Sequence, residues 1–577
     1  MWRFDFGGDA PLIFSDPVET FTANRPEGVR DALRAAEVAR RHGYWIAGML
    51  SYEAANGLDD TLITQRAEDF PLVWLGAFGA PSRHADESSG EPYHLGDWEA
   101  KEWDLLGYRQ RIGTIREAIR AGQTYQLNYT VRLGSAFSGS PAAWYEDLRG
   151  TKAGDFSAYL DVGQYAVLSL SPELFFRMHG SLVETRPMKG TAARGAYTLT
   201  DNHRRAALQQ SEKERAENIM IVDLMRNDLS RLAQLGSVTV DTLCDVERYP
   251  TVWQLTSTVR AQRRPELTWA DCLQTLFPSG SITGAPKVRT MELIRDLEQS
   301  PRGAYCGSLG YVTPKGDAVF NVAIRTVVVD RFAGRASFGT GGGITWDSDA
   351  DAEYREIWAK AAFLDTVRRD VSLIETTRLQ EGHLALLDYH TDRLKHAVEY
   401  FGWPWYPQRV RAAWSRLARH TGRWRVRLLY GPDGHVRTTR HPFQGAPMGV
   451  KRVAYARQAM PPKDAWTWHK TTRRERYSID IPDQQPPVFD YILFNEEGEI
   501  TEFTRGNLVL ESATGMLLTP RDEAGLLPGT MRQWLLESGM IREARITRAE
   551  VSAAKAIWFI NSVYGWVPVH LVVGTPL

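Results

Sequence analysis

Cysteine, net charge and long apolar runs are all scarce in this sequence. Only 3 cysteines occur among 577 residues, and the wide spacing of Cys244, Cys272 and Cys306 argues against a disulfide framework or a cysteine-built zinc site. A formal net charge of -1 offers no basic footprint for nucleic acid. No run of about 18 apolar residues marks a membrane span, and the N-terminus lacks the basic and apolar regions of a signal peptide. These absences favour a cytoplasmic protein that binds neither nucleic acid nor a membrane.

The residues that are present indicate two units of different size. A chain of 577 residues is too long for a single core. Strand-like runs and long helices alternate between residues 150 and 350, which indicates a large, layered α+β or α/β domain of sheets and helices. Lys360–Arg369 is expected to close it as a helix, and we place the boundary at the charged end, Arg368-Arg369-Asp370. We predict a first domain over 1–369, with an N-terminal part at 1–100 and a core at 101–369, and a smaller domain over 370–577.

The stretch Ser211–Arg231 sets two carboxylates one helical turn apart. Glu214 and Glu217 are spaced i, i+3 and therefore share a face. The residues behind them are apolar nearly all round, which is typical of a buried helix. Buried carboxylates need a cationic partner, and Mg²⁺ is a suitable one. Ordinary surface salt bridges are the alternative, but a second i, i+3 pair at Glu353 and Glu356 favours the metal.

Further residues near these acids in the sequence could bind and attack an anionic substrate. Lys189 lies between an apolar residue and a glycine, where desolvation would lower its pKa and make the amine nucleophilic. A surface lysine in a turn is the alternative. The small-residue loop 277–287 opens a helix, and the glycine run 339–343 also offers backbone amides to an anion. A strand expected over Ala318–Val329 carries Arg325.

These strings together resemble the chorismate-utilising family over about residues 100–366. TRPMKGTAARG, SEKERAENIMIVDLMRNDLSR, FPSGSITGAPK, PRGAYCGSLGY, NVAIRT and GTGGGI carry the resemblance. It implies that Glu217 and Glu356 hold Mg²⁺, with Glu214 and Glu353 beside them through water. It implies that Glu173 is the acid that assists loss of the C4 hydroxyl of chorismate. The substrate-binding residues that it implies are Arg325, Tyr305, Lys360, Gly341, Gly342, Gly343, Gln126, Thr283 and Gly284.

Two positions bear on which reaction such an enzyme performs. Gln126 stands where members that add water to chorismate carry a lysine base. Lys189 stands where anthranilate-forming members usually have alanine, and it resembles the lysine of members that aminate chorismate at C4. In those members the amine attacks C2 and is displaced as ammonia enters at C4. An anthranilate-forming first domain stays the alternative. No cysteine sits in a glutaminase nucleophile turn, so we expect ammonia to come from a separate glutaminase subunit.

The second unit holds the residue types that pyridoxal 5'-phosphate needs. Lys470 is followed after about thirty residues by Glu502, and then by the turn Gly529-Thr530 at the head of a helix. With Arg393 in the string HTDRL, they resemble the fold-type IV pyridoxal-phosphate enzymes over about 373–577, most closely the aminodeoxychorismate lyases. The resemblance implies that Arg393, Thr530 and Gly529 hold the phosphate, that Lys470 forms the Schiff base, and that Glu502 keeps the ring nitrogen protonated.

The order of the two units suggests one pathway, because the product of the first would be the substrate of the second. Chorismate and ammonia would give 4-amino-4-deoxychorismate, and elimination of pyruvate would give 4-aminobenzoate, a folate precursor. Relatives of the second unit begin with a β-hairpin before the Glu375-Thr376-Thr377-Arg378 string, and this chain lacks it. An amino-acid aminotransferase and an inactive docking module therefore stay open as alternatives. Homodimerisation through the C-terminal domain is a further hypothesis.

Overall fold

The computed structural model describes residues 1–577 apart from 8–9, 68–69, 85–91, 101–103, 151–153, 196–197, 250–251, 366–370, 402, 446–447, 461–466, 475–476, 478–487 and 573–577. The chain divides into two compact units, one of Met1–Ala193 with Arg204–Arg368 and one of Arg194–His203 with Arg369–Leu577. The boundary predicted at Arg368-Arg369-Asp370 lies outside the described residues. No described helix is both long and apolar enough to cross a bilayer.

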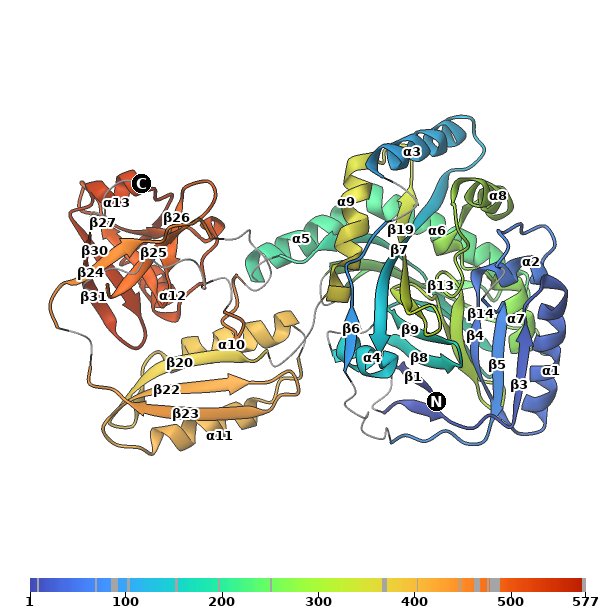
Figure 1. Ribbon diagram of the computed structural model, residues 1–577, viewed down its shortest axis with the longest axis horizontal. Coiled ribbons are helices and arrows are strands. Elements are labelled where there is room, and N and C mark those ends of the chain that lie inside the picture. Colours follow the sequence, from blue (N-terminus) through green and yellow to red (C-terminus); the bar gives the residue numbers. More distant parts are fainter. Residues whose placement is uncertain are drawn as a thin grey trace. The chain divides into compact units, whose positions relative to one another are not determined.

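The first unit is built on two large sheets whose described strand pairs are all antiparallel (Figure 1). The nine-stranded sheet has the order β15 (Gly284–Ala285), β7 (Gln126–Gly139), β19 (Arg335–Ile344), β18 (Thr326–Asp330), β9 (Tyr165–Ser171), β8 (Phe156–Val162), β1 (Trp2–Phe6), β2 (Leu12–Phe14), with β6 (Tyr93–Leu95) beside β7. The ten-stranded sheet has the order β12 (Met188–Ala193), β14 (Val252–Gln262), β11 (Leu182–Arg186), β10 (Leu174–His179), β17 (Ala318–Asn321), β16 (Ser308–Val312), β4 (Trp45–Leu50), β5 (Val73–Phe78), β3 (Glu19–Ala23), with β13 (Thr239–Arg248) beside β14.

The first unit also contains nine described α-helices and four short 3-10 turns. The helices are α1 (Val29–Arg41), α2 (Ala55–Leu58), α3 (Leu105–Arg120), α4 (Pro141–Gly150), α5 (Thr198–Gln210, whose first turns belong to the other unit), α6 (Glu212–Ser230), α7 (Trp269–Leu276), α8 (Lys287–Leu297) and α9 (Ala350–Ala361). The turns are η1 (Pro26–Gly28), η2 (Tyr52–Ala54), η3 (Gly280–Ile282) and η4 (Ala362–Asp365).

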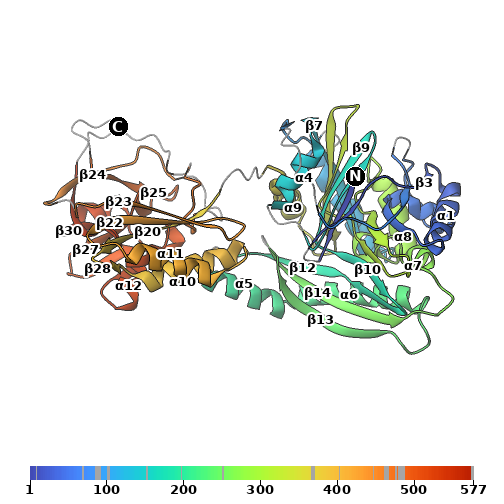
Figure 2. The ribbon, with the colours of Figure 1, turned by 90° about the horizontal axis from the view of Figure 1, so that it is seen from below.

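Apolar side chains on both faces of both sheets make this unit a four-layer sandwich. Because successive strand residues point to opposite faces, Ile46 and Leu50 of β4 pack toward α1, α6 and α7, whereas Ala47 and Met49 face the other sheet. The far face of the nine-stranded sheet packs on α4 through Trp144 and neighbouring residues. Figure 2 shows α6 lying along β12 and β14, and the contacts between these elements agree. This packing brings the helix with the first acid pair next to the strand with Lys189.

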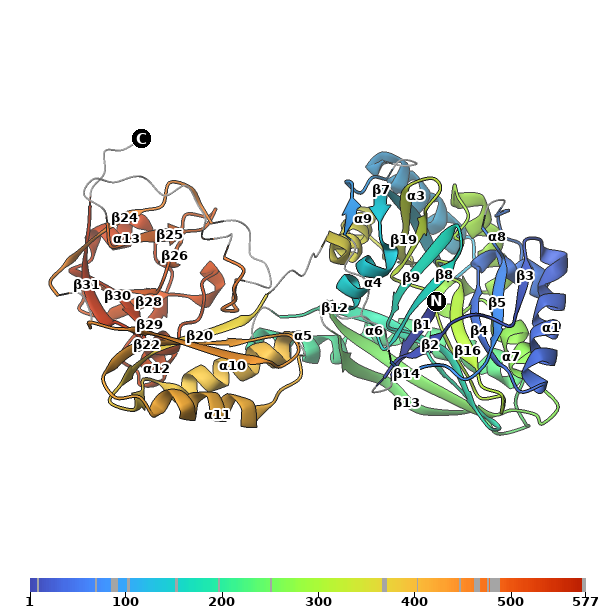
Figure 3. The ribbon, with the colours of Figure 1, turned by 60° about the horizontal axis from the view of Figure 1, so that its bottom comes forward.

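The second unit combines a four-stranded and an eight-stranded sheet (Figure 3). The smaller sheet has the order β21 (His383–Leu384), β20 (Leu373–Gln380), β22 (Arg423–Tyr430), β23 (Val436–Pro442), and α10 (Leu387–Phe401) and α11 (Pro407–Ala418) pack against it. The larger sheet has the order β26 (Ile500–Phe503), β25 (Asp490–Phe494), β24 (Lys451–Tyr455), β31 (Gly565–Leu571), β30 (Ala556–Asn561), β27 (Asn507–Glu511), β28 (Leu517–Pro520), β29 (Arg542–Ala544). Helices α12 (Thr530–Glu537) and α13 (Arg548–Ala553) and the turn η6 (Asp522–Ala524) complete the described elements.

Three local expectations from the sequence are wrong. Ala318–Val329 is not one strand, because β17 and β18 belong to different sheets and Arg325 between them has a φ of 49°. The helix expected over Lys360–Arg369 ends as an α-helix at Ala361, and Ala362–Asp365 form the 3-10 turn η4, whereas 366–369 lie outside the described residues. Helix α6 is not buried all round, since the side of Ile219 is 38% exposed. Apolar composition alone did not reveal the change of sheet or the solvent-facing side of α6.

Candidate functional site

Lys189 lies on β12, at the edge of the ten-stranded sheet, and its amine reaches the glycine-rich strand β19 of the other sheet. A Cβ atom on Gly343 would come within 2.1 Å of Lys189 Nζ, so only glycine leaves room for this approach. The amine lies 4.0 Å from Glu217 Oε2 on α6. Burial lowers the pKa of Lys189, and although Glu217 opposes this, the charge of Lys360 adds to it. The structure therefore favours a neutral, nucleophilic amine more than an exposed position would.

The two acid pairs lie on α6 and α9, and the charge of Lys189 acts on members of both. The side chain of Ser211 caps α6 by accepting a hydrogen bond from the Glu214 amide, which fixes where this helix begins. Burial raises the pKa of Glu214, and the charge of Glu217 adds to this. Burial of carboxylates beside one another leaves them in need of positive charge.

On α9 the acids differ in their partners. Burial raises the pKa of Glu353, although its Oε1 accepts a hydrogen bond of 2.9 Å from the Ser348 hydroxyl. Burial opposes the ionisation of Glu356, but Lys360 Nζ lies 2.8 Å away and lowers the pKa of Glu356 overall. Within the described parts of the chain, no three His, Cys, Asp or Glu side chains are gathered closely enough to form a metal site.

Glu173 lies between β9 and β10 and is only 3% exposed. The Ser281 hydroxyl, from the loop 277–287, donates a hydrogen bond of 2.6 Å to Glu173 Oε1. Burial raises the pKa of Glu173 to about 7, and Ser281 and Lys189 limit this rise. A carboxyl group with this pKa carries a proton to deliver near neutral pH. Ser281 was not predicted from the sequence, because nothing distinguishes it from the other small residues of its loop.

Removing the Ser281 hydroxyl should change the pH range in which Glu173 can act as an acid. The hydrogen bond stabilises the carboxylate, so Ser281→Ala should raise the pKa of Glu173 above its present value of about 7. If Glu173 acts as an acid it must be protonated, so the fall in reaction rate at high pH should move up by roughly one to two pH units. A pH profile of kcat/KM for the substrate measures this shift. Ser230→Ala, at an exposed hydroxyl, is the control, and an unshifted profile in Ser281→Ala would remove Glu173 from the acid role.

Two polar side chains in this region, one buried and one half-buried, have no hydrogen-bond or ion-pair partner among the described residues. The amide of Gln126, on β7, is 1% exposed and neither its nitrogen nor its oxygen is hydrogen-bonded. The side chain of Arg325 shows no ion pair or hydrogen bond, and burial lowers its pKa. Buried groups of this kind normally have partners, so a substrate that supplies an acceptor and a carboxylate would satisfy both.

The remaining predicted binding residues lie on segments that contact β7 and β19. The Thr283 carbonyl accepts from the Asn128 amide at 2.8 Å, and a Cβ on Gly284 would come within 2.1 Å of the Gln126 carbonyl.

On β19, the Gly341 carbonyl accepts a hydrogen bond of 2.7 Å from Lys360 Nζ. A Cβ on Gly342 would lie 3.2 Å from Glu353 Oε2. The buried ring of Tyr305 packs against Gly339 of β19.

In the second unit, Lys470 is held through its backbone by the first strand of that unit. The Ile374 amide of β20 donates to the Lys470 carbonyl at 2.8 Å, and the Thr472 amide donates to the Ser372 carbonyl. Burial lowers the pKa of Lys470 to about 7, and the charge of Arg393 adds to this effect. No hydrogen bond of its amine to another described side chain is seen, so the amine can react as a base or nucleophile near neutral pH.

Glu375 connects the residues predicted to seat a phosphate. Its carboxylate accepts from Arg393 at 3.0 and 2.6 Å and lies 2.5 Å from His390 Nδ1. Burial would raise the pKa of Glu375, but Arg393 and His390 outweigh it and lower the value to about 2. His390 Nε2 lies 3.2 Å from Thr530 Oγ1, at the start of α12. This role of Glu375 was not predicted from the sequence.

Glu502 and Gly529 lie around the turn that leads into α12. Glu502 is 3% exposed, and its Oε1 accepts from the Tyr477 hydroxyl at 3.0 Å and the Leu527 amide at 3.2 Å. A Cβ on Gly529 would come within 2.0 Å of Asn507 Oδ1, so the turn requires glycine. Arg393 Nη1 donates to the Pro528 carbonyl of the same turn. These contacts gather Arg393, Glu502, Gly529 and Thr530 around one short segment.

Comparison with known families decides what these two sites belong to. Residues 81–366 match the family described as chorismate binding enzyme, and residues 372–572 match the class IV amino-transferases. The chain joins a chorismate binding enzyme domain to a class IV aminotransferase domain. The predicted fold class is thereby confirmed: a large chorismate binding domain of mixed sheets and helices precedes a smaller aminotransferase-like domain.

Most of the curated relatives of the chorismate binding domain are named aminodeoxychorismate synthase, and an anthranilate synthase component 1 from Haloarcula marismortui is also similar, at 38% identity over 257 residues. It is similar to aminodeoxychorismate synthase from Streptomyces griseus, at 44% identity over 309 residues, covering 52% of this chain and 42% of that protein. It is similar to aminodeoxychorismate synthase component 1 from Salmonella typhimurium, at 38% identity over 300 residues, covering 52% of this chain and 64% of that protein. The chain thus spans about half the length of these relatives.

The solved structures extend the likeness of the chorismate binding domain to its fold. Anthranilate synthase component I from Streptococcus pneumoniae superposes with a TM-score of 0.53 at 25% identity, covering 63% of this chain and 92% of that chain. A fold shared with an anthranilate synthase does not by itself choose the reaction. That choice depends on the residues at the site.

Proposed function

We propose that this protein makes 4-aminobenzoate in two steps, by aminating chorismate with ammonia and then eliminating pyruvate from 4-amino-4-deoxychorismate. The observation that carries the proposal is the position of Lys189, whose half-buried amine lies against Gly343 and close to both acid pairs. Relatives named aminodeoxychorismate synthase support the first step. The class IV domain, in which the pKa of Lys470 is lowered to about 7, supports the second.

In the first step, Lys189 acts as the nucleophile and Glu173 as the acid. The neutral amine of Lys189 attacks C2 of chorismate, the C4 hydroxyl departs, and the proton of Glu173 leaves with it as water. Ammonia then forms the bond to C4, and the C2–Nζ bond breaks and releases Lys189. The lowered pKa of Lys189 suits the attack, because the free amine is then neutral and nucleophilic. It also suits the departure, because the protonated nitrogen of the C2 adduct leaves as the neutral amine, and a less basic amine leaves more readily. The products are 4-amino-4-deoxychorismate and water.

Substrate binding would use the two polar side chains that have no hydrogen-bond or ion-pair partner in the described part of the chain, Gln126 and Arg325. The Arg325 guanidinium is suited to a carboxylate of chorismate, and the Gln126 amide to a hydroxyl or ether oxygen. Tyr305, Thr283, Gly284 and the amides of Gly341, Gly342 and Gly343 would complete the pocket, with Lys360 as a second cation. Gln126 has no basic nitrogen, so it cannot activate water as a lysine at this position would.

The acid pairs fit a magnesium ion by the chemistry of their donors. Glu217 and Glu356 would hold it directly and Glu214 and Glu353 through water, and all four supply the oxygen ligands that this ion prefers. Burial raises the pKa of Glu214 and Glu353, which indicates that these carboxylates lack sufficient positive charge. When bound, Mg²⁺ would neutralise a substrate carboxylate within the pocket.

The class IV domain fits pyridoxal phosphate by the charges around Lys470. Thr530 and Gly529 at the start of α12, with Arg393, would hold the phosphate, and Glu502 would keep the ring nitrogen protonated. When bound, the cofactor would supply an electron sink for the elimination of pyruvate. Lys470 would carry the cofactor and move a proton, for which a pKa of about 7 is suited. The three free cysteines agree with a reducing, cytoplasmic setting.

A separate glutaminase subunit is part of the proposal and can be tested directly. With ammonium and Mg²⁺ the purified chain should form 4-amino-4-deoxychorismate, whereas glutamine should support no more than background formation. The measurement is the rate of product formation with each nitrogen source at equal concentration. Equal rates with glutamine would contradict the need for a partner, and failure with both would contradict the amination itself.

A further inference from the structure

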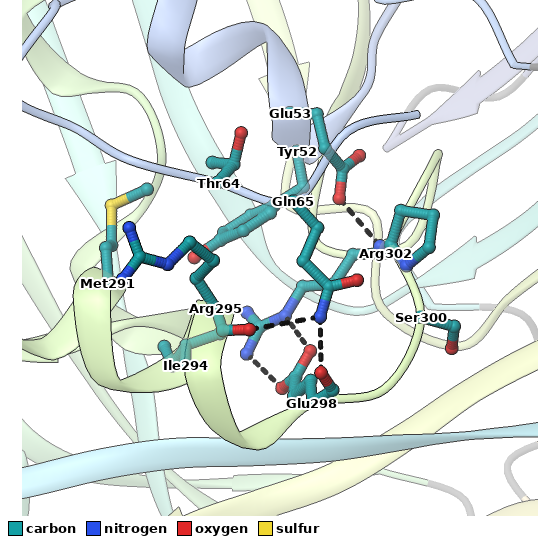
Figure 4. A pocket seen from close by; sticks show the side chains of 11 residues that line it. Tyr52, Glu53, Thr64, Gln65, Met291, Ile294, Arg295, Glu298, Ser300 and Arg302 are labelled. Atoms are coloured by element: carbon teal, nitrogen blue, oxygen red, sulfur yellow. Dashed lines mark hydrogen bonds and ion pairs between the residues drawn. The ribbon is translucent and has the colours of Figure 1, made fainter. Parts of the chain in front are cut away.

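One buried arginine of the chorismate binding domain, Arg302, makes an unusually complete set of contacts. Its guanidinium donates to Glu298 Oε2 at 3.0 Å and to Glu298 Oε1 at 2.7 Å. Their side chains are 1% and 3% exposed. The face of the guanidinium stacks on the ring of Tyr52, with Cζ 4.4 Å from the ring centre. Figure 4 shows this group, with Glu298 below Arg302 and Glu53 and Gln65 above it. Nothing proposed so far for the reaction uses it.

The same guanidinium joins two segments that carry predicted substrate-binding residues. Arg302 Nη1 donates to the Ile282 carbonyl at 2.7 Å, one residue before Thr283. Arg302 Nη2 donates to the Asn128 carbonyl of β7 at 2.8 Å, two residues after Gln126. The backbone of Arg302 itself belongs to a third segment, which leads to Tyr305. One side chain therefore fixes the relative positions of Gln126, Thr283 and Tyr305.

Glu298 strengthens this connection from the other side. Its Oε1 also accepts from the Thr130 amide at 2.9 Å and the Thr130 hydroxyl at 2.8 Å, on β7. Arg132, two residues further along β7, donates to Glu298 Oε2 at 3.3 Å and lies over the ring of Tyr305, 5.2 Å from its centre. Every oxygen of the Glu298 carboxylate thus has at least one donor from this network.

The N-terminal part of the chain completes the arrangement. Glu53 Oε1 accepts from the Arg302 amide at 2.7 Å, and Glu53 Oε2 accepts from the Gly303 amide at 3.0 Å. Gln65 Nε2 donates to the Arg295 carbonyl at 3.2 Å and also to the Glu298 carbonyl. The side chain of Glu53 is buried, and it holds the segment 302–305 at its backbone. Residues far from the acid pairs in sequence therefore hold one wall of the proposed pocket.

We propose that Arg302, Glu298 and Glu53 form a positioning junction that sets the three substrate-binding segments of the chorismate pocket against one another. The proposal rests on the proposed function for the identity of the substrate. The contacts of the junction are observed independently of that function. None of the three residues touches the predicted reacting groups. Arg302 acts through the backbone of β7 and the loop 277–287, and Glu53 acts through the backbone of 302–303. The junction is the means by which the N-terminal part, residues 1–100, contributes to binding in the core.

Two substitutions test the junction while keeping side chains of similar size in the core. Arg302→Lys keeps the charge but loses the fork that reaches Glu298, Ile282 and Asn128 together. Glu53→Gln keeps the shape but presents an amide group to one of the two backbone N–H groups. Each should raise the KM for chorismate by about tenfold or more, with a smaller change in kcat, because hydrogen bonds to charged groups are lost from the walls of the pocket. Arg120→Lys and Glu117→Gln, which alter an exposed i, i+3 pair on α3, should leave both constants unchanged.

A purely structural role would give a different kinetic result. If these variants merely unfold more easily, the active fraction falls and the apparent kcat drops at an unchanged KM. Amide hydrogen exchange without substrate provides a second readout: protection should fall in 126–130, 282–284 and 302–305 and stay unchanged in the β8–β9 hairpin. An unchanged KM together with unchanged protection in these three segments would overturn the proposal. If protection falls in the variants but the unaltered chain does not aminate chorismate, the junction stands and the proposed function is wrong.

Discussion

Lys189→Ala is expected to lower the rate of chorismate amination by about 10³-fold or more, which is the range seen when a covalent nucleophile is removed. The reason is that the proposed bond between Nζ and C2 cannot form, so ammonia has no activated C4 to attack. The class IV domain of the same variant should release pyruvate from supplied 4-amino-4-deoxychorismate at the normal rate. The two rates are measured on one preparation, one with chorismate and ammonium and the other with the intermediate.

Lys213→Ala is the matched control for the loss of a positive charge. Lys213 is an exposed residue of α6, and its charge also lowers the pKa of Glu214 and Glu356. If Lys189 acted only by balancing the acids, the two variants would lose similar amounts of activity. Normal amination by Lys189→Ala, or an equal loss in Lys213→Ala, would remove Lys189 from the covalent role. A shift of the product to anthranilate in Lys189→Ala would keep Lys189 as the residue that selects the reaction.

Lys470→Ala is expected to abolish release of pyruvate while leaving the amination step intact, so that 4-amino-4-deoxychorismate accumulates from chorismate. The reason is that the Lys470 amine, with a pKa of about 7, would both carry the cofactor and move the proton. The variant should also lose the visible absorbance that pyridoxal phosphate acquires when it is covalently bound to a lysine. This spectroscopic readout does not depend on turnover.

Lys395→Ala supplies the control for the class IV domain, because Lys395 lies on the surface of α10, where it pairs with Glu399 at 3.9 Å and is 49% exposed. It should keep both the absorbance and the release of pyruvate. If the unaltered chain shows neither after pyridoxal phosphate is added, the docking-module alternative gains support. Faster transamination of a 2-oxo acid than release of pyruvate would support the aminotransferase alternative.

Local patterns in the sequence predicted the acid pairs well, because an i, i+3 spacing is decided within one helix. The structure places Glu214 and Glu217 on α6 and Glu353 and Glu356 on α9. Their roles as ligands stay predictions. Long-range contacts could not be predicted in this way: Ser281 and Glu173 are separated by 108 residues, and only the docking of a loop brings them together.

Failures of the sequence analysis have a common physical reason. Residues 318–329 are apolar enough to continue one strand, but the chain changes sheets between Asn321 and Thr326. No local pattern marks this change. The junction of Arg302, Glu298 and Glu53 was missed for the same reason, since its partners come from four separate segments of the chain. Local periodicity identifies elements, whereas the contacts between elements determine which buried polar groups meet.

The most direct test of the account is to supply the purified chain with chorismate, ammonium and Mg²⁺ and to identify the products with and without pyridoxal phosphate. We expect 4-amino-4-deoxychorismate alone in the absence of the cofactor, and 4-aminobenzoate with an equal amount of pyruvate in its presence. Formation of anthranilate, with or without the cofactor, would contradict it.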